Sequence, residues 1–251
     1  MCDYSGDTRP LLRLFNAVAG RYDLMNRILT FGLDRRWRAA AAEEMFAHRP
    51  ARILDLCCGT GDLLVNILRR SGADADIYGV DFSRPMLDKA RKKITGIPGA
   101  PCLVQADVRS LPFPDGFFDA VGTAFAFRNL TYRNRYTKDY LAEIYRVLSS
   151  TGKFVIVESS QPRSRAFRAV FHAYASVGIK KIGGIIAGEP GAYSYFAESA
   201  KNYYDADGLC VLLSDAGFVD IRHRPLFFGV AALTCTGKSG DLREKNRDLQ
   251  A

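Results

Sequence analysis

Acidic residues recur at or near the ends of the predicted strands of this 251-residue chain. Asp55 lies in the apolar run at 51–57, Asp81 ends the run at 76–81, and Asp107 ends the run at 101–107. In an open α/β sheet the carboxyl ends of parallel strands meet at one edge, where ligands bind. The carboxylates are therefore predicted to face one ligand, and they suit a cationic group better than a pyrophosphate.

A small-residue loop, "CCGTG" at 57–61, connects the first of these strands to a predicted helix beginning at Gly61 or Asp62. Such a loop lets the backbone pass close to a ligand. A dinucleotide fingerprint would place Gly or Ala three residues after Gly61, where this chain has Leu64. Asp81 is well placed to accept both hydroxyls of a ribose. The pattern favours a nucleoside bearing a sulfonium cation; the alternative is that Gly59 and Gly61 only turn the chain and the acids cap helices.

Two adjacent cysteines, Cys57 and Cys58, lie in this loop. The six cysteines show no C-x-x-C spacing and the three histidines are scattered, so no metal site is predicted. Neighbouring cysteines are poorly placed for a relaxed disulfide. Both are therefore predicted to form part of the pocket wall.

The order of apolar runs predicts an α/β fold. Five strands are predicted at 51–57, 76–81, 101–107, 117–126 and 153–159, with a helix at 138–148 before the last. Two more strands follow within 217–237, joined by a short turn at Arg224 and Pro225, so they must pair antiparallel. The expected fold is a seven-stranded, mostly parallel sheet with one antiparallel strand near its edge, and residues 8–48 are expected to be helical.

Composition fits one sizeable domain, with 48% hydrophobic and 25% charged residues. The divisions predicted are an N-terminal helical lid at 1–48, a ligand-binding domain at 49–237 with an insertion at about 162–204, and a polar tail at 238–251. No run approaches the roughly 20 apolar residues of a membrane span, and no secretory signal is recognised, so a cytoplasmic location is predicted. The net charge of +8 favours an anionic partner such as nucleic acid, an acidic membrane or an anionic substrate.

Several stretches resemble class I S-adenosylmethionine-dependent methyltransferases, namely "LDLCCGTGDL" (54–63), "GVDFSRPMLDKAR" (79–91) and "ADVRSLPFPDGFFD" (106–119). More narrowly, residues 15–237 resemble the C-methyltransferases of ubiquinone and menaquinone biosynthesis. That match is carried by "YDLMNRILTFGLDRRW" (22–37) and "RVLSSTGKFVIVESS" (146–160), with "FRNL" (127–130) and "YSYFAES" (193–199) as further landmarks. The resemblance implies a Rossmann-like sheet with helices on both faces.

The resemblance also implies S-adenosylmethionine as cofactor. The residues expected to bind it are Asp55, Gly59, Thr60, Gly61, Asp81, Phe82, Met86, Asp107, Val108, Ala124, Tyr22 and Asn26. Tyr22 and Asn26, with Asp23 beside them, would close over the cofactor as a lid or merely cap a helix. The chain departs from the family at Thr30 (usually Ser), Asp34 (usually His) and 149–152 (usually Lys-Pro-Gly-Gly), and Ala124 takes a place that is Ser in some relatives.

The acceptor implied by the resemblance is a polyprenylated quinol, whose ring carbon is methylated once the neighbouring hydroxyl loses its proton. Such a site needs a cation for the phenolate and a modest base. Arg128 is the expected stabiliser, with Asn129 orienting it or the ring; the alternative is a surface ion pair. Glu158 is a candidate base or a structural hydrogen-bond acceptor. Tyr195, with Tyr193, is expected either to cover the acceptor or to pack in the core.

The segment 165–188 mixes aromatic and aliphatic residues with Arg165, Arg168, Lys180 and Lys181. It is expected to line a tunnel for the prenyl tail, to rest on an anionic bilayer, or simply to form a core-packed helix pair. The oligomeric state is left open, a homodimer being one option. Rival readings are a methyltransferase for a phospholipid amine or small phenol, a cofactor-binding scaffold, and a nucleic-acid protein, the last disfavoured because the arginines are dispersed.

Overall fold

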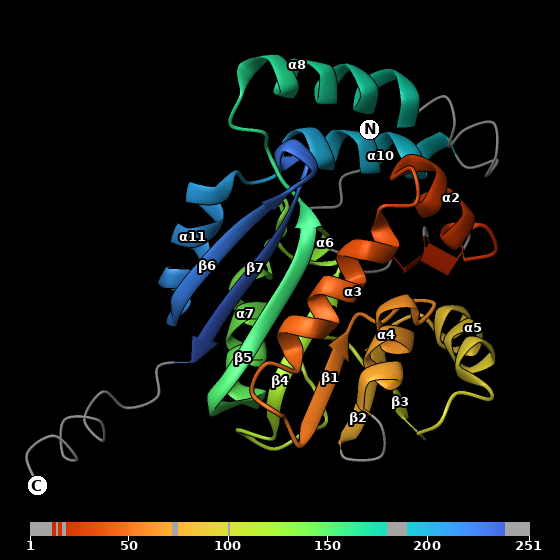
Figure 1. Cartoon of the computed structure of the whole chain (residues 1–251), viewed down its shortest axis with the longest axis vertical. Coiled ribbons are helices and arrows are strands. Elements are labelled where there is room, and N and C mark those ends of the chain that lie inside the picture. Colours follow the sequence, from red (N-terminus) through yellow and green to blue (C-terminus); the bar gives the residue numbers. More distant parts are fainter. Residues whose placement is uncertain are drawn as a thin grey trace, which may run out of the picture.

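A seven-stranded sheet forms the centre of the protein in the computed structural model, which describes residues 12–13, 15–16, 19–71, 75–99, 101–179 and 190–238. The strand order is β3-β2-β1-β4-β5-β7-β6 (Figure 1). The strands are β1 (Arg52–Leu56), β2 (Asp76–Asp81), β3 (Cys102–Gln105), β4 (Phe118–Ala124), β5 (Leu148–Ser159), β6 (Phe218–Leu226) and β7 (Ala231–Lys238). All seven predicted strands are present.

Strand direction follows the prediction. The first five strands pair in parallel, whereas β7 runs antiparallel to both of its neighbours, β5 and β6. The sheet is thus mostly parallel with one antiparallel strand next to its edge, as predicted. This direction brings the carboxyl ends of β1, β2, β4 and β5 to one edge of the sheet (Figure 1).

Two strand boundaries differ from the prediction. The turn between the last strands lies at η2 (Phe227–Gly229), not at Arg224 and Pro225, because both of those residues pair with β7. Pro225 is tolerated there because β6 is an edge strand. β5 begins at Leu148, earlier than the predicted start at residue 153, and Leu148 pairs with Phe118 of β4.

Helices cover both faces of the sheet. One face packs on α3 (Asp34–Met45), α4 (Asp62–Ser71) and α5 (Arg84–Ile94). The other packs on α6 (Phe127–Thr131), α7 (Thr137–Val147) and α11 (Ala206–Asp215). Apolar residues at helical spacing explain the packing, since Tyr140, Leu141, Ile144 and Val147 of α7 are all buried.

A second layer of helices lies over the carboxyl ends of the strands (Figure 1). It comprises α2 (Tyr22–Leu29), α8 (Arg165–Ala173), the π-helical turn η1 (Tyr174–Ile179) and α10 (Pro190–Lys201). A small cluster that includes Phe15, Met25, Met86 and Ala197 joins this layer to α5. No helix in the described ranges combines the length and apolar character that a membrane span requires.

Lys180, Lys181 and the predicted tail from residue 239 lie outside the described residues. The predicted helical stretch at 8–48 contains α2 and α3, separated by a turn at 30–33. α3 packs directly on the sheet through Trp37, Ala41 and Met45. It therefore belongs to the core of the molecule, whereas α2 lies over the strand ends.

Candidate active site

The loop after β1 turns sharply through residues with positive φ. Cys57, Gly59 and Gly61 have φ of 54°, 53° and 84°, a region that glycine adopts most easily. At Gly61 an added Cβ would lie 3.0 Å from Cβ and 3.2 Å from Cα of Ala90 on α5. Glycine is therefore needed at position 61 both for the turn and for the close packing of two helices.

Asp81 joins this loop to the next strand end. Its carboxylate accepts hydrogen bonds from the backbone N–H of Gly59 at 2.9 Å and of Ser83 at 2.8 Å. Burial raises the pKa of Asp81 to about 6, although these two donors oppose the shift. The carboxyl group is thus held at a fixed place on the cavity wall and titrates close to neutrality.

The other two strand-end acids differ in environment. Asp55 is buried, which raises its pKa well above the ordinary value, and one of its oxygens has no hydrogen-bond partner in the described structure. Asp107 lies two residues beyond the end of β3 and forms an ion pair with Arg109 at 2.7 Å. The three acids thus border one cavity in different surroundings.

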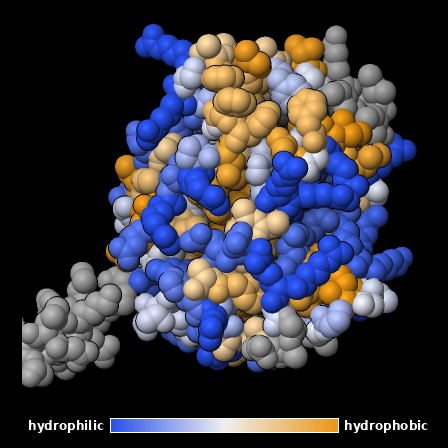
Figure 2. Space-filling model, in the orientation of Figure 1, coloured by the Kyte–Doolittle hydropathy of each residue, from blue (hydrophilic) through white to orange (hydrophobic). Residues whose placement is uncertain are grey.

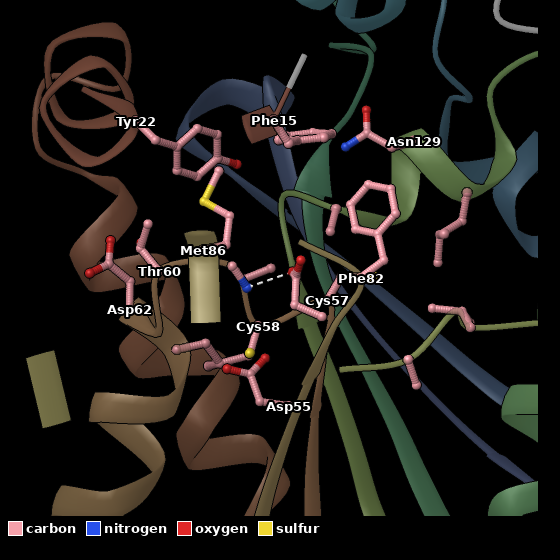
Figure 3. Close-up of a pocket in the computed structure, with 18 of the residues that line it drawn as sticks. Phe15, Tyr22, Asp55, Cys57, Cys58, Thr60, Asp62, Phe82, Met86 and Asn129 are labelled. Carbon is pink, nitrogen blue, oxygen red and sulfur yellow. Dashed lines mark hydrogen bonds between the residues drawn. The ribbon is translucent and has the colours of Figure 1, made fainter. Parts of the chain in front are cut away.

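The first cavity opens at these strand ends. Figure 3 shows Tyr22, Phe15 and Asn129 on one side of it, with Cys57, Cys58 and Asp55 on the other. Its wall combines the predicted cofactor residues Tyr22, Asp55, Gly59, Thr60, Asp81, Phe82, Met86, Asp107, Val108 and Ala124 with the further residues Phe15, Arg38, Cys57, Cys58, Asp62, Leu63, Ala106, Ala126, Asn129, Leu130 and Tyr140. Carboxylates, backbone N–H groups and apolar surface together fit a nucleoside with a charged side arm.

The two loop cysteines are wall residues. Burial and the nearby carboxylates raise the thiol pKa of both Cys57 and Cys58 well above the ordinary value, so neither is a thiolate at neutral pH. Within the ranges described, no group of three or more His, Cys, Asp or Glu side chains is arranged to hold a metal ion.

A polar network ties α2 to the cofactor loop. Lys93 of α5 donates to Asp23 at 2.6 Å and to Asp62 at 2.6 Å, and it also reaches Thr60 at 3.2 Å. The Thr60 hydroxyl in turn donates to Asp23 at 2.5 Å. Because Asp23 lies on α2, one lysine fastens this helix to the start of α4.

A second, mostly apolar cavity adjoins the first, and Tyr22 lines both. Its empty space, counted with its open mouth, is about 1580 Å³ against about 920 Å³ for the first, so it is the wider chamber. The lining consists of Tyr22, Asn26, Leu29, Thr30, Phe31, Leu33, Trp37, Phe125, Arg128, Ser159, Phe167, Val170, Phe171, Tyr174, Phe196, Ala200, Phe227, Phe228, Val230 and Ala231. Its aromatic wall suits a flat apolar ligand.

Arg128 is the cation on the wall of the second cavity. Its guanidinium donates to the Ser159 hydroxyl at 2.7 Å and lies 3.5 Å from a carboxylate oxygen of Glu158. The other Glu158 oxygen accepts the backbone N–H of Arg128 at 3.1 Å. Arg128 is buried, and its Nε, itself a buried atom, has no hydrogen-bond partner in the described structure.

Some of the predicted site residues lie elsewhere. Asn26 lines the second cavity and not the first, and its side chain lies within hydrogen-bonding reach of the Tyr22 hydroxyl. Gly61 supports the loop from behind, Glu158 lies behind Arg128, and Tyr195 belongs to the cluster around Met25 and Met86. These three line neither cavity.

Arg38 is a site residue that sequence reasoning missed. It is buried, lines the first cavity, forms a close ion pair with Asp34 and lies 3.8 Å from Asp62. The Thr30 hydroxyl donates to Asp34 at 3.0 Å. Two of the residues at which the chain departs from the family pattern are therefore hydrogen-bonded to each other, next to Arg38. The four-residue spacing of Asp34 and Arg38 in a predicted helix was the available signal.

The cavity-lining residues Trp37, Phe125 and Tyr140 were also missed by sequence reasoning, because aromatic residues in helices and strands usually indicate core.

Comparison with known proteins gives one consistent answer. The model of the ubiE/COQ5 methyltransferase family matches residues 4–238. A demethylmenaquinone methyltransferase of Thermus thermophilus is 42% identical over 88% of this chain and 97% of its own length. A ubiquinone/menaquinone biosynthesis C-methyltransferase UbiE of Geobacter sulfurreducens is 38% identical over 90% of this chain and 87% of its own.

Solved structures agree on the fold. A SAM-dependent methyltransferase from Aquifex aeolicus superposes with a TM-score of 0.53 at 18% identity, covering 74% of this chain and 81% of that one. The family match spans nearly the whole chain, including the cofactor loop, α2 and the Arg128 region. The chain therefore belongs to the ubiE/COQ5 methyltransferase family.

Proposed function

We propose that the protein transfers the methyl group of S-adenosylmethionine to a ring carbon of a polyprenylated quinol, converting demethylmenaquinol to menaquinol or methylating 2-methoxy-6-polyprenyl-1,4-benzoquinol. The names of its relatives support this reaction. The observation that carries the proposal is the pair of adjoining cavities, one polar and acidic, the other aromatic with a buried arginine on its wall.

S-adenosylmethionine is the methyl donor and supplies an electrophilic sulfonium methyl. The residues of the first cavity fit it by their chemistry. Asp81 would accept hydrogen bonds from the ribose hydroxyls, Asp107 and the backbone of Val108 would hold the adenine, and Arg38 would offer a cation for the carboxylate of the methionine moiety. The unpartnered oxygen of Asp55 is available to a donor of the same moiety.

Arg128 stabilises the oxyanion of the acceptor. A quinol hydroxyl that loses its proton pushes electron density onto the neighbouring ring carbon, which forms the new bond to the methyl group as the carbon–sulfur bond breaks. The ring carbon then loses its own proton and the ring becomes aromatic again. The guanidinium of Arg128 and the low polarity of the cavity favour the phenolate form.

Other residues position these groups. Glu158 holds the Arg128 guanidinium and backbone, which supports a positioning role more strongly than that of a base in direct contact with the ring. Asn26 lines the second cavity, where its amide is a candidate contact to a quinol oxygen. Asn129 lines the first cavity instead, and its unpartnered amide oxygen can accept a hydrogen bond from a ligand there. Tyr22 lies between donor and acceptor, where it excludes water from the transfer. A role of Tyr195 in covering the acceptor stays a prediction.

The predicted segment 165–188 contributes Phe167, Val170, Phe171 and Tyr174 to the second cavity. This supports the prediction that it guides the prenyl tail. A cytoplasmic location at the inner face of a membrane, with peripheral contact to the lipid, follows from a lipid-tailed acceptor. The homodimer stays a prediction.

The proposal is tested by deleting the gene and profiling isoprenoid quinones by mass spectrometry. We expect a quinone one methyl group lighter than the mature one to accumulate, and the wild-type gene to restore the mature form. An unchanged quinone pool would refute the assignment. The mass of the accumulated species also identifies the acceptor, and accumulation of another unmethylated lipid would favour the rival methyltransferase reading.

A further inference from the structure

Five apolar side chains stand exposed around the mouth of the second cavity, and we call them the aromatic rim. Phe31 is 74% exposed, Phe228 66% and Val170 67%. The rim consists of Phe31, Phe167, Val170, Phe227 and Phe228, all of which line that cavity. Figure 2 shows apolar side chains gathered at the top of the molecule, over α8. Soluble proteins rarely keep large apolar groups together in water without a partner for them.

The backbone presents these side chains outward at a cost. Phe31, Phe227 and Phe228 have φ of 54°, 42° and 56°, a conformation that bulky residues seldom adopt. The ring of Phe228 stacks on Phe167 of α8 with a centroid distance of 4.6 Å. Two separate elements, the β6–β7 corner and α8, are thus joined into one apolar ridge. Strain of this kind is found where function requires the conformation.

The charge around the aromatic rim is positive. The segments 21–37, 160–179 and 222–231 carry the rim and contain only two acids, Asp23 and Asp34. Both are engaged, because Asp23 is paired with Lys93, and Asp34 is buried against Arg38. Exposed arginines of the same segments are Arg21, Arg27, Arg35, Arg36, Arg163, Arg165, Arg222 and Arg224, of which Arg222 pairs with Glu44 at 3.1 Å. An apolar ridge within a cationic surface is complementary to an anionic lipid bilayer.

We propose that the aromatic rim inserts into the acyl region of an anionic bilayer, so that the mouth of the second cavity opens into lipid. This inference rests on the proposed function, because it explains how an acceptor with a prenyl tail reaches Arg128. The tail stays in the membrane while the quinol ring enters the cavity. The arginines around the rim bind lipid phosphates and fix the depth of insertion.

The test compares the F31S/F228S double variant with V211S in vesicle sedimentation. Val211 is 59% exposed on α11 and lines neither cavity, so it controls for the loss of any exposed apolar group. With vesicles of equimolar phosphatidylcholine and phosphatidylglycerol, F31S/F228S should weaken binding by about tenfold or more. V211S should bind like the wild type, and pure phosphatidylcholine should bind all three poorly. Equal binding by the wild type and F31S/F228S would overturn the proposal.

A second measurement locates the rim in the membrane. Brominated acyl chains should quench the fluorescence of the F228W variant more than that of the wild type, whose single tryptophan, Trp37, is buried. Quenching equal to the wild-type background would overturn insertion. A change in oligomeric state on F31S/F228S substitution without loss of vesicle binding would instead identify the rim as a contact between copies of the chain.

Activity separates this inference from the proposed function. Because Phe31 and Phe228 also line the acceptor cavity, the test is the ratio of the two losses: F31S/F228S should lose a much larger factor of turnover on a long-tailed quinol in vesicles than on a tail-less, water-soluble quinol. Equal loss on both acceptors would contradict a role in membrane delivery. If the wild type methylates no quinol while vesicle binding still depends on the aromatic rim, the proposed function is refuted. The proposal that the rim inserts into a bilayer would then still hold.

Discussion

The carboxyl group of Asp81 is the proposed acceptor for the ribose hydroxyls, and its pKa is about 6. It must be ionised to accept two hydroxyl donors in addition to its two backbone N–H donors. Because burial raises its pKa to about 6, the group gains a proton as the pH falls through that value. Among the described residues no histidine lines either cavity, and burial raises the pKa of Asp55 at the same cavity in the same direction as that of Asp81.

We therefore expect cofactor affinity to fall at low pH. If only the ionised form of Asp81 binds, the dissociation constant of S-adenosylhomocysteine should rise about tenfold between pH 8 and pH 5, since one pH unit below the pKa leaves about a tenth of the group ionised. Isothermal titration calorimetry across this range measures it. The Asp81→Asn variant should bind weakly with no such slope. A wild-type dissociation constant that is flat from pH 8 to pH 5 would contradict this account.

Cys57 tests the steric role of the loop wall. Cys57 lines the first cavity with φ of 54°, and any non-glycine residue there bears the same backbone cost. Cys57→Ala should change the cofactor dissociation constant less than about twofold, whereas Cys57→Leu should raise it about tenfold by filling the cavity. Calorimetry on the matched pair compares them. Loss of activity in Cys57→Ala with normal cofactor binding would show a chemical role for the thiol instead.

At the scale of elements, α2 is held over the cofactor loop through Asp23, which accepts from both Lys93 and the Thr60 hydroxyl. Lys93→Met removes the contacts to Asp23, Asp62 and Thr60, so α2 should close less completely and the cofactor dissociation constant should rise about threefold to tenfold. The matched control is Arg84→Met, which breaks an exposed pair with Asp88 on the same helix. If Lys93→Met bound the cofactor as tightly as the wild type, the Lys93 contacts would not be what holds α2 closed. Equal losses of cofactor affinity in Lys93→Met and Arg84→Met would contradict that role as well.

Elements differed in how far the sequence predicted them. Strands and their directions followed from apolar runs and from the short connection before β7. The β6–β7 turn did not, because Arg224 and Pro225 look like turn residues, while the actual corner uses phenylalanines with positive φ. The early start of β5 was missed as well, since residues 149–151 are polar and half-buried or exposed, and so lack the apolar pattern of a strand.

The candidate site was predictable in its cofactor half because glycines and strand-end acids follow local rules. Its acceptor half depends on tertiary contacts. Asn26 and Arg128 meet Phe125, Phe171 and Phe227 only when α2, α8 and the β6–β7 corner close around one cavity. No residue spacing in the sequence predicts that these three elements surround one cavity. Aromatic residues in helices and at strand ends more often pack in the core.

For the whole molecule, the two cavities and the basic surface form a single path. In the proposed reaction the donor would occupy the strand-end cavity and the acceptor the apolar one, where Arg128 lies, and Tyr22 lines both. A net charge of +8 fits association with an anionic lipid surface without any nucleic-acid module. The sheet positions the cofactor loop, and the helices above the strand ends line the second cavity, where the proposed acceptor would bind.

The central claim is tested most directly by methyl transfer with purified protein. S-adenosylmethionine labelled in its methyl group and a demethylmenaquinol should give menaquinol with the label on the ring carbon, detected by mass spectrometry. Arg128→Met should lower turnover about a hundredfold or more, with the cofactor dissociation constant within about twofold of the wild type. Arg133→Met, which removes an exposed ion pair with Glu198, is the control and should keep wild-type turnover. Absence of labelled quinol from the wild type, or unchanged turnover in Arg128→Met, would contradict the account.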